Sequence, residues 1–172
     1  LGGAGRRYKR EHRKACSRII SEMYSPPRVP PEIVRSKNKH VLPGFALDLT
    51  VLDPDDGMPW DFSVTAKRVK ARRIIATTKL MLLIGSPMCT AFSTWQRINN
   101  LKSADPQLVA RKWAEACMHM RFVCELYHDQ LEGGRYFLHE HPKEPSSWQL
   151  ECMAKLAATT RVDVTAADQC QY

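Results

Sequence analysis

The chain has 172 residues, the length of about one ordinary domain, and it contains 26 Lys and Arg residues against 18 Asp and Glu residues, a net charge of +8. Residues 1–40 contain eleven basic and three acidic side chains, so they carry the whole excess, and the rest of the chain is neutral. This distribution excludes a uniformly basic nucleic-acid coat protein and indicates a neutral folded body with a basic arm. No apolar run approaches the roughly 20 residues of a membrane span, so we expect no membrane insertion.

Cysteine usage and the N-terminal composition bear on the compartment. The first twenty residues are basic and lack the apolar segment of a signal peptide. The chain has six cysteines: Cys16, Cys89, Cys117, Cys124, Cys152 and Cys170. With no secretory signal, and with enough apolar residues for a core, they are predicted to be reduced thiols of an intracellular protein. No Cys-x-x-Cys pair occurs, which argues against a zinc ribbon.

The first half of the chain predicts helices and strands separated by proline and glycine. The expected elements are a basic helix over 5–18, a strand over 19–24 that stops at Ser25-Pro26-Pro27, a helix from Pro30, a strand over 45–50, a turn over 53–57 and a helix over 63–77. In the last helix we expect the apolar side to hold Val64, Val69 and Ile74-Ile75, and we expect Lys67, Arg68, Lys70, Arg72 and Arg73 in solvent.

The second half continues the alternation. The continuous apolar run within residues 79–85 predicts a buried strand of a parallel sheet. Asp105 followed by Pro106 predicts the start of a long helix that Gly133-Gly134 ends. A core strand over 135–139, a helix over 146–159 and a last strand over 162–166 complete the pattern.

This order of elements predicts an α/β fold with one domain, an open, mostly parallel Rossmann-like sheet with flanking helices. We expect a basic arm over 1–18 and the sheet domain over 19–172. In such sheets ligands bind at the carboxyl ends of the strands, so the segments that follow the strands hold the candidate site.

Cys89 and Glu140 are the candidate catalytic residues. Cys89 follows the buried strand in a turn rich in Gly, Ser and Pro, where a thiol can be partly exposed and reactive; the alternative is a small buried apolar residue. Glu140 lies between His139 and His141 at a strand end, either as a proton-holding carboxyl or as a solvated side chain. The two histidines, two residues apart on a strand, would share a face and could bind a metal only with a third ligand, which the sequence does not identify.

Several segments resemble the motifs of the DNA cytosine-5 methyltransferases. Residues 85–93, Gly-Ser-Pro-Met-Cys-Thr-Ala-Phe-Ser, resemble the family's Gly-x-Pro-Pro-Cys-Gln-x-Phe-Ser nucleophile loop, and residues 137–142, Phe-Leu-His-Glu-His-Pro, resemble its Glu-Asn-Val-Pro strand end. Residues 22–25, Glu-Met-Tyr-Ser, resemble the segment that opens the cofactor site, and residues 164–170 resemble the approach to the Gln-x-Arg-x-Arg motif. The motifs follow one another in the family's order over residues 19–171.

The resemblance implies a mechanism and a set of site residues. The Cys89 thiolate would attack a flipped-out cytosine, Glu140 would assist at ring nitrogen 3, and S-adenosylmethionine would supply the methyl group. The implied cofactor-binding residues are Tyr24, Ser25, Asp48, Asp61 and Pro87, and the implied substrate-binding residues are Arg28, Ser86, Ser93 and His139. The implied partner is nucleic acid, DNA before RNA, with the basic arm either contacting phosphates or acting only as a tail.

Two other hypotheses remain open. The family's glycine-rich cofactor loop is replaced by Ser25-Pro26-Pro27-Arg28, so the chain could be a catalytically inactive nucleic-acid-binding module that kept the fold. The pattern also resembles modules of retrotransposon or viral polyproteins, in which such a module could occur. The other hypothesis is a cysteine hydrolase that pairs Cys89 with His139 or His141.

Overall fold

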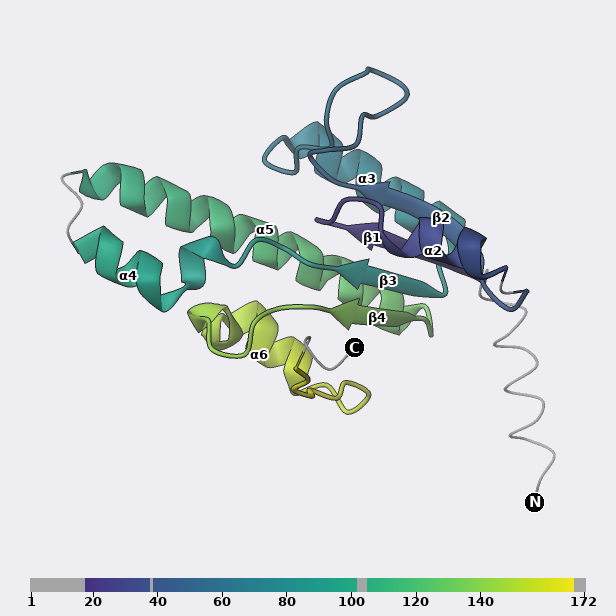
Figure 1. The fold of residues 1–172 in the computed structure, drawn as a ribbon. Helices are drawn as coiled ribbons and strands as arrows, with labels where there is room; N and C mark the ends of the chain where they lie inside the picture. The colour runs from purple at the N-terminus through teal and green to yellow at the C-terminus, as the bar shows by residue number, and fades with distance from the viewer. Residues whose placement is uncertain (1–17, 38, 102–104, 169–172) are drawn as a thin grey trace. The chain divides into compact units, whose positions relative to one another are not determined.

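The computed structural model describes residues 18–37, 39–101 and 105–168 (Figure 1). These residues form two compact units. Unit 1 contains the described residues up to Pro87 together with Glu125–Glu140, and unit 2 contains Met88–Cys124 and the described residues from His141 onward. The expected basic helix over 5–18 lies outside the described residues except for its last position.

Unit 1 is built on one four-stranded, all-parallel sheet. Its strands are β1 (Ile19–Met23), β2 (Leu42–Leu47), β3 (Leu82–Gly85) and β4 (Tyr136–His139), in the order β2-β1-β3-β4. The predicted α/β class and parallel sheet are therefore confirmed. The central position of β3, with Leu83 fully buried, explains its continuous apolar run.

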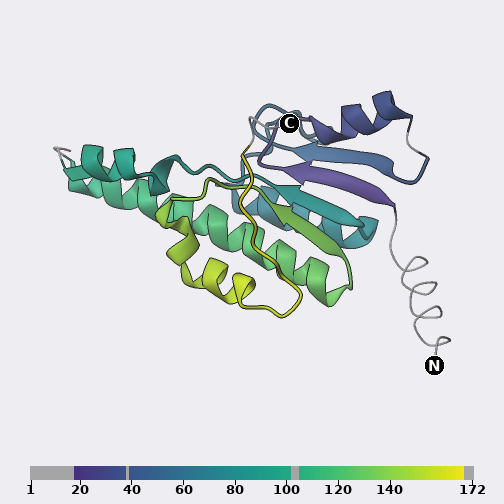
Figure 2. The same cartoon turned by 60° about the horizontal axis from the view of Figure 1, so that its bottom comes forward.

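The helices of unit 1 cover opposite faces of the sheet. Helix α2 (Val29–Ser36) connects β1 to β2, which is the neighbour of β1 on one side. Helix α3 (Thr65–Thr78) then connects β2 to β3, which is the neighbour of β1 on the other side. Because parallel crossovers are right-handed, two connections that run in opposite directions place their helices on opposite faces, as Figure 2 shows. Residues 125–132, the end of α5 (Pro106–Glu132), lie on the same face as α3. The strand order therefore reverses between β1 and β3.

Helix α3 faces the core along a line that agrees with our prediction at Ile75 but not at Val64 and Val69. Its buried side chains are Lys67, Ala71 and Ile75, spaced at four residues, whereas Val69 is 64% exposed and Val64 is also exposed. The assignment of Lys67 to solvent was wrong, because Lys67 reaches buried and partly buried carboxylates of the preceding loop.

Helix α5 confirms the local signals at both of its ends. Asp105 accepts a hydrogen bond from the backbone N–H of Leu108 at 2.9 Å, and Gly134, in the left-handed region at φ 68°, follows the helix. Near its end, the fully buried Gln130 donates to the carbonyls of Leu80 and Tyr136 at 3.2 and 2.9 Å. Gln130 therefore ties α5 to the starts of the two strands β3 and β4.

Strand β4 is an edge strand, not the core strand that we predicted. Tyr136 and Leu138 are 56% and 53% exposed. They lie on the sheet face that carries α2, and α2 packs on β1 and β2 and does not reach β4. The fifth strand expected over 162–166 does not form: the described residues there pair with no strand. Two boundaries also differ, since β2 begins at Leu42, and the helix expected over 146–159 is divided into the 3-10 helix η2 (Ser146–Gln149) and α6 (Glu151–Ala157).

Unit 2 contains the 3-10 helix η1 (Thr90–Phe92), α4 (Thr94–Leu101), the first part of α5, η2 and α6. Its centre is the buried Phe92, whose ring lies 5.1 Å from that of Trp113 and 6.5 Å from that of His141. The Ser146 hydroxyl donates to the Phe92 carbonyl at 3.2 Å. These contacts hold the turn that follows Cys89 against the segment that starts at His141.

Candidate functional site

The carboxyl ends of the four strands of unit 1 lie along one edge of the sheet. Three backbone hydrogen bonds continue the ladder there: Tyr24 N–H to Leu47 O at 3.0 Å, Ser86 N–H to Met23 O at 3.2 Å and Glu140 N–H to Gly85 O at 3.0 Å. This edge carries seven of the predicted site residues: Tyr24, Ser25, Asp48, Ser86, Pro87, His139 and Glu140. The reversal of strand order between β1 and β3 marks the point at which open α/β sheets bind ligands.

Glu22 fills the N-terminus of α2 from inside the protein. Its carboxylate is 2% exposed and accepts hydrogen bonds from the backbone N–H groups of Arg28, at 2.9 and 3.1 Å, and Val29, at 3.0 and 3.2 Å. The four prolines around them, at positions 26, 27, 30 and 31, have no N–H. A phosphate, which usually binds at such a helix N-terminus, would meet a carboxylate there. Arg28 itself is exposed, and its role as a substrate-binding residue stays a prediction, because its hydrogen bonds here are made by its backbone, to Glu22 and Glu32.

Tyr24 is held in an unusual backbone conformation directly after β1. Its φ of 58° lies in the left-handed region, and its ring lies 4.8 Å from that of Phe62. Burial raises the pKa of the Tyr24 hydroxyl well above its ordinary value, with nearby Arg68 acting to lower it and Asp61 to raise it. The hydroxyl therefore stays protonated at every physiological pH. The structure thus brings together Tyr24 and Asp61, two of the predicted cofactor residues.

Asp48 presents a carboxylate just beyond β2. Its Oδ1 accepts hydrogen bonds from the backbone N–H and the hydroxyl of Thr50, at 3.0 and 2.7 Å. No described residue bonds to Oδ2, so one oxygen remains for a ligand hydroxyl. Asp61 uses its Oδ1 for the backbone N–H of Ser63 at 2.8 Å, and Ser25, which is buried, donates through its hydroxyl to the Pro26 carbonyl at 3.0 Å.

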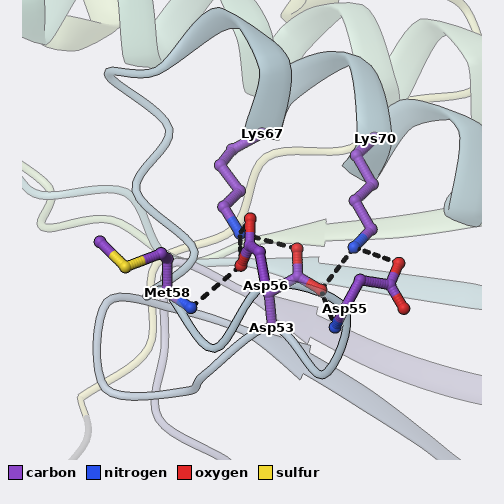
Figure 3. A network of polar contacts seen from close by, with 6 residues as sticks. All are labelled: Asp53, Asp55, Asp56, Met58, Lys67 and Lys70. Atoms are coloured by element: carbon purple, nitrogen blue, oxygen red, sulfur yellow. Dashed lines mark hydrogen bonds and ion pairs between the residues drawn. The ribbon is translucent and has the colours of Figure 1, made fainter.

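An ion network fixes the loop that connects Asp48 to Asp61. Lys67 Nζ lies 2.7 Å from Oδ2 of the fully buried Asp53 and 2.7 Å from Oδ1 of Asp56 (Figure 3). Lys70 forms ion pairs with Asp53 and Asp55. Both ammonium groups also lie over the ring of Trp60, at 5.1 and 5.3 Å from its centroid. This network clamps residues 53–60 onto α3.

The network shifts the ionisation of its members in the direction of the charged forms. Burial acts to raise the pKa of Asp53, but hydrogen bonds and charge from Lys67 and Lys70 outweigh it and hold the pKa well below its ordinary value. The pKa of Lys67 is raised, because its bonds to Asp53 and Asp56 outweigh the effect of desolvation. The clamp is therefore fully charged at neutral pH.

Cys89 belongs to unit 2 and is half-buried at the start of η1. Its carbonyl accepts the N–H of Phe92 at 3.0 Å, and its thiol bonds to no described residue. Within unit 2, the Cys89 thiol forms no hydrogen bond to His141, one of the two histidines that a cysteine hydrolase could pair with it. Two other thiols are less suited to attack: burial raises the pKa of Cys117, and Cys124 is buried against Met153.

Ser93, a predicted substrate-binding residue, serves as the cap of α4. Its hydroxyl accepts the N–H of Gln96 at 3.1 Å and donates to the Thr90 carbonyl at 3.0 Å. The sequence contained this signal, since Ser followed three residues later by Gln is a capping box, but the helix was not predicted.

The two histidines around Glu140 have different surroundings. His139, in unit 1, contacts the Tyr127 hydroxyl through Nδ1 at 3.2 Å, whereas His141, in unit 2, packs edge-on against Phe92 and Trp148. The expectation that they share a strand face was wrong, because β4 ends at His139. Within the described ranges, no group of three or more His, Cys, Asp or Glu side chains could hold a metal ion. Glu140, directly after β4, is exposed.

Comparison with known proteins identifies no relative: no family model matches the chain, and neither a curated protein nor a solved structure is significantly similar to it. Among the helices of the described residues, none combines the length and the apolar character that crossing a bilayer requires.

Proposed function

We propose that the chain is a cytosine-5 methyltransferase-like domain that acts on DNA. The observation that carries the proposal is the match between motif order and sheet topology. Segments that resemble the family's motifs follow β1, β3 and β4 in a parallel sheet, so the cofactor segment at Tyr24 and the segments that lead to Cys89 and contain Glu140 all start from one edge. The reversal of strand order falls between the first two of them.

The residues at this edge fit a cofactor without a phosphate group. The N-terminus of α2 is filled by Glu22, which disfavours dinucleotide cofactors, whose pyrophosphate binds at that place in related folds. S-adenosylmethionine has no phosphate and supplies an electrophilic methyl group. Asp48 would accept hydrogen bonds from the ribose hydroxyls through Oδ2, as an acidic residue beyond the second strand does in such folds. Tyr24 and Ser25, with Pro87, would border the site, and Asp61 lies close enough to Tyr24 to act on its hydroxyl electrostatically.

The chain's own residues would activate the base. The Cys89 thiolate forms a bond to ring carbon 6 of cytosine, and Glu140 holds a proton at ring nitrogen 3, which accepts the electron pair pushed through the ring. Carbon 5 then becomes nucleophilic and takes the methyl group. Loss of the carbon 5 proton expels the thiolate and restores the aromatic ring. Ser86, Ser93, Arg28 and His139 are the candidates for holding the base and its backbone.

Methyl transfer to cytosine-containing DNA tests this proposal. Radiolabelled S-adenosylmethionine should transfer label to DNA with the wild-type chain, and Cys89→Ser should lower the rate by at least about 10³-fold because a hydroxyl is not ionised at neutral pH. Cys152→Ser is the matched control, since Cys152 is also a half-buried thiol in unit 2, and it should retain the wild-type rate. Equal rates for wild type and Cys89→Ser would contradict the assigned nucleophile.

A second candidate function, a nucleic-acid-binding module without catalysis, is favoured by the loop after β1. Residues 25–31 form this loop and the first turn of α2, and four of them are prolines; the N–H groups of Arg28 and Val29 are already bonded to Glu22. This loop offers a ligand few donors. Calorimetry with S-adenosylmethionine separates the two functions: a Kd in the micromolar range supports the methyltransferase, and DNA binding without any cofactor binding supports the module.

A further inference from the structure

The Tyr127 hydroxyl lies between two groups at the carboxyl ends of β3 and β4. It is 3.3 Å from the Gly85 carbonyl oxygen and 3.2 Å from His139 Nδ1. Tyr127 is fully buried on α5, and its ring stacks on Phe137 at 4.3 Å with an interplanar angle of 18°. The stacked ring fixes the position of the hydroxyl, so the chemistry of its two neighbours decides how the proton is shared.

Only one arrangement makes both contacts hydrogen bonds. A hydroxyl has one proton to donate, and the Gly85 carbonyl can only accept. That carbonyl also accepts the N–H of Glu140, but its two lone pairs accommodate both donors. If Tyr127 donates to Gly85, its oxygen must accept from His139, and Nδ1 must carry the proton. If Tyr127 instead donates to Nδ1, the contact with Gly85 joins two acceptors and no bond forms.

We propose that Tyr127 is a positioning residue that holds His139 as the Nδ1-protonated tautomer through a chain running from Nδ1–H to the Tyr127 oxygen and from the Tyr127 hydroxyl to Gly85. In the neutral ring Nε2 is then the acceptor. Tyr127 thereby connects α5 to the strand ends that precede Pro87 and Glu140. The inference concerns the imidazole and stands whether or not the chain transfers methyl groups.

Long-range ¹H–¹⁵N NMR of the side chains tests the inference, because it reports which ring nitrogen carries the proton. The spectrum is recorded with the full chain at about pH 8, above the ordinary histidine pKa of about 6.5. His139→Gln identifies the signals of His139 among those of the six histidines. The predicted result for wild type is a majority Nδ1–H ring. A majority Nε2–H ring in wild type overturns the proposal without any further variant.

Tyr127→Phe tests whether the hydroxyl is the cause. Its ring keeps the stacking on Phe137, and His139 should lose the Nδ1–H preference and become mainly Nε2–H. Tyr136→Phe removes the hydroxyl of an exposed tyrosine on β4 and should leave the His139 pattern unchanged. An unchanged Nδ1–H majority in a folded Tyr127→Phe variant would show that another group selects the tautomer, and would overturn the role of Tyr127.

Discussion

Gly44 lies where β2 runs too close to β1 for any side chain. A Cβ at this position would be 2.1 Å from Ser21 Oγ and 2.6 Å from the Ile20 carbonyl oxygen. The same approach lets the N–H of Phe45 bond to Ser21 Oγ at 3.2 Å, next to the irregular register of the strand pair. We predict that Gly44→Ala lowers the free energy of unfolding by about 1–3 kcal/mol through overpacking, measured by urea denaturation.

Gly57→Ala provides the comparison for Gly44→Ala. Gly57 has open space around it but a φ of 68°, so the added methyl group costs about 1 kcal/mol of backbone strain and no steric clash. Adding Ser21→Ala to Gly44→Ala should recover only part of the loss, because the Ile20 carbonyl remains. A Gly44→Ala variant as stable as wild type would show that the strands separate at no cost.

At the residue scale, the sequence pointed to the strand-end residues but not to the charged residues inside the fold. Tyr24, Asp48, Ser86 and Glu140 lie at the predicted edge, because parallel strands end on the same side. The burial of Glu22 and Lys67 was not predicted, because charged side chains are exposed by default and only tertiary partners reverse that. The local signal for the burial of Glu22 was the pair of N–H groups at Arg28 and Val29, which stand between two pairs of prolines.

At the scale of elements, the Asp53–Lys67 pair links the loop after β2 to α3. Lys67→Met would leave the buried Asp53 with Lys70 as its remaining ionic partner and would release Asp56. Breaking a buried pair from one side is strongly destabilising, so we predict that Tm falls by at least about 5 °C in calorimetry. Arg73→Met, on the exposed side of the same helix, should change Tm by less than about 2 °C. Similar Tm values for the two variants would contradict the clamp.

The same pair predicts how stability depends on pH. The pKa of Asp53 is depressed in the folded chain, so its contribution is complete above the ordinary aspartate pKa of about 3.9 and is lost as the pH falls through the lower native value. Wild-type stability should therefore rise from about pH 2 to about pH 4, and Asp53→Asn should flatten this rise while lowering stability at pH 7. Urea denaturation at each pH measures both effects. An equal slope in the two proteins would exclude Asp53 as its source.

Elements with local signals were predicted, and elements that depend on tertiary pairing were not. The apolar run of β3 and the Asp105-Pro106 start of α5 can each be recognised from a few neighbouring residues. Residues 162–166 were predicted as a strand, but a strand forms only where it pairs with another strand, and local sequence does not show whether that pairing occurs. The predicted apolar side of α3 was right at Ile75 and wrong at Val64 and Val69, because the buried Lys67 takes a position at which the pattern leads one to expect an apolar residue.

At the scale of the whole molecule, the net charge belongs to the first 40 residues, and residues 41–172 are neutral. Residues 1–15 contain six basic side chains and one acidic one. Deleting them should weaken DNA binding, and the slope of log K against log salt should become shallower by roughly one for each phosphate that the arm neutralises in the wild-type complex. Fluorescence anisotropy over a salt series measures both quantities. An unchanged slope would show that the arm does not bind phosphates.

Covalent capture on DNA that contains 5-fluorocytosine tests the proposed chemistry most directly. Fluorine replaces the proton that must leave carbon 5, so an enzyme that has attacked carbon 6 and transferred the methyl group stays bound to the DNA. In the presence of S-adenosylmethionine, the wild-type chain and Cys152→Ser should form an adduct that survives denaturing electrophoresis, and Cys89→Ser should form none. Absence of the adduct with wild type, or its persistence in Cys89→Ser, would contradict the assignment of this chain as a cytosine-5 methyltransferase that uses Cys89.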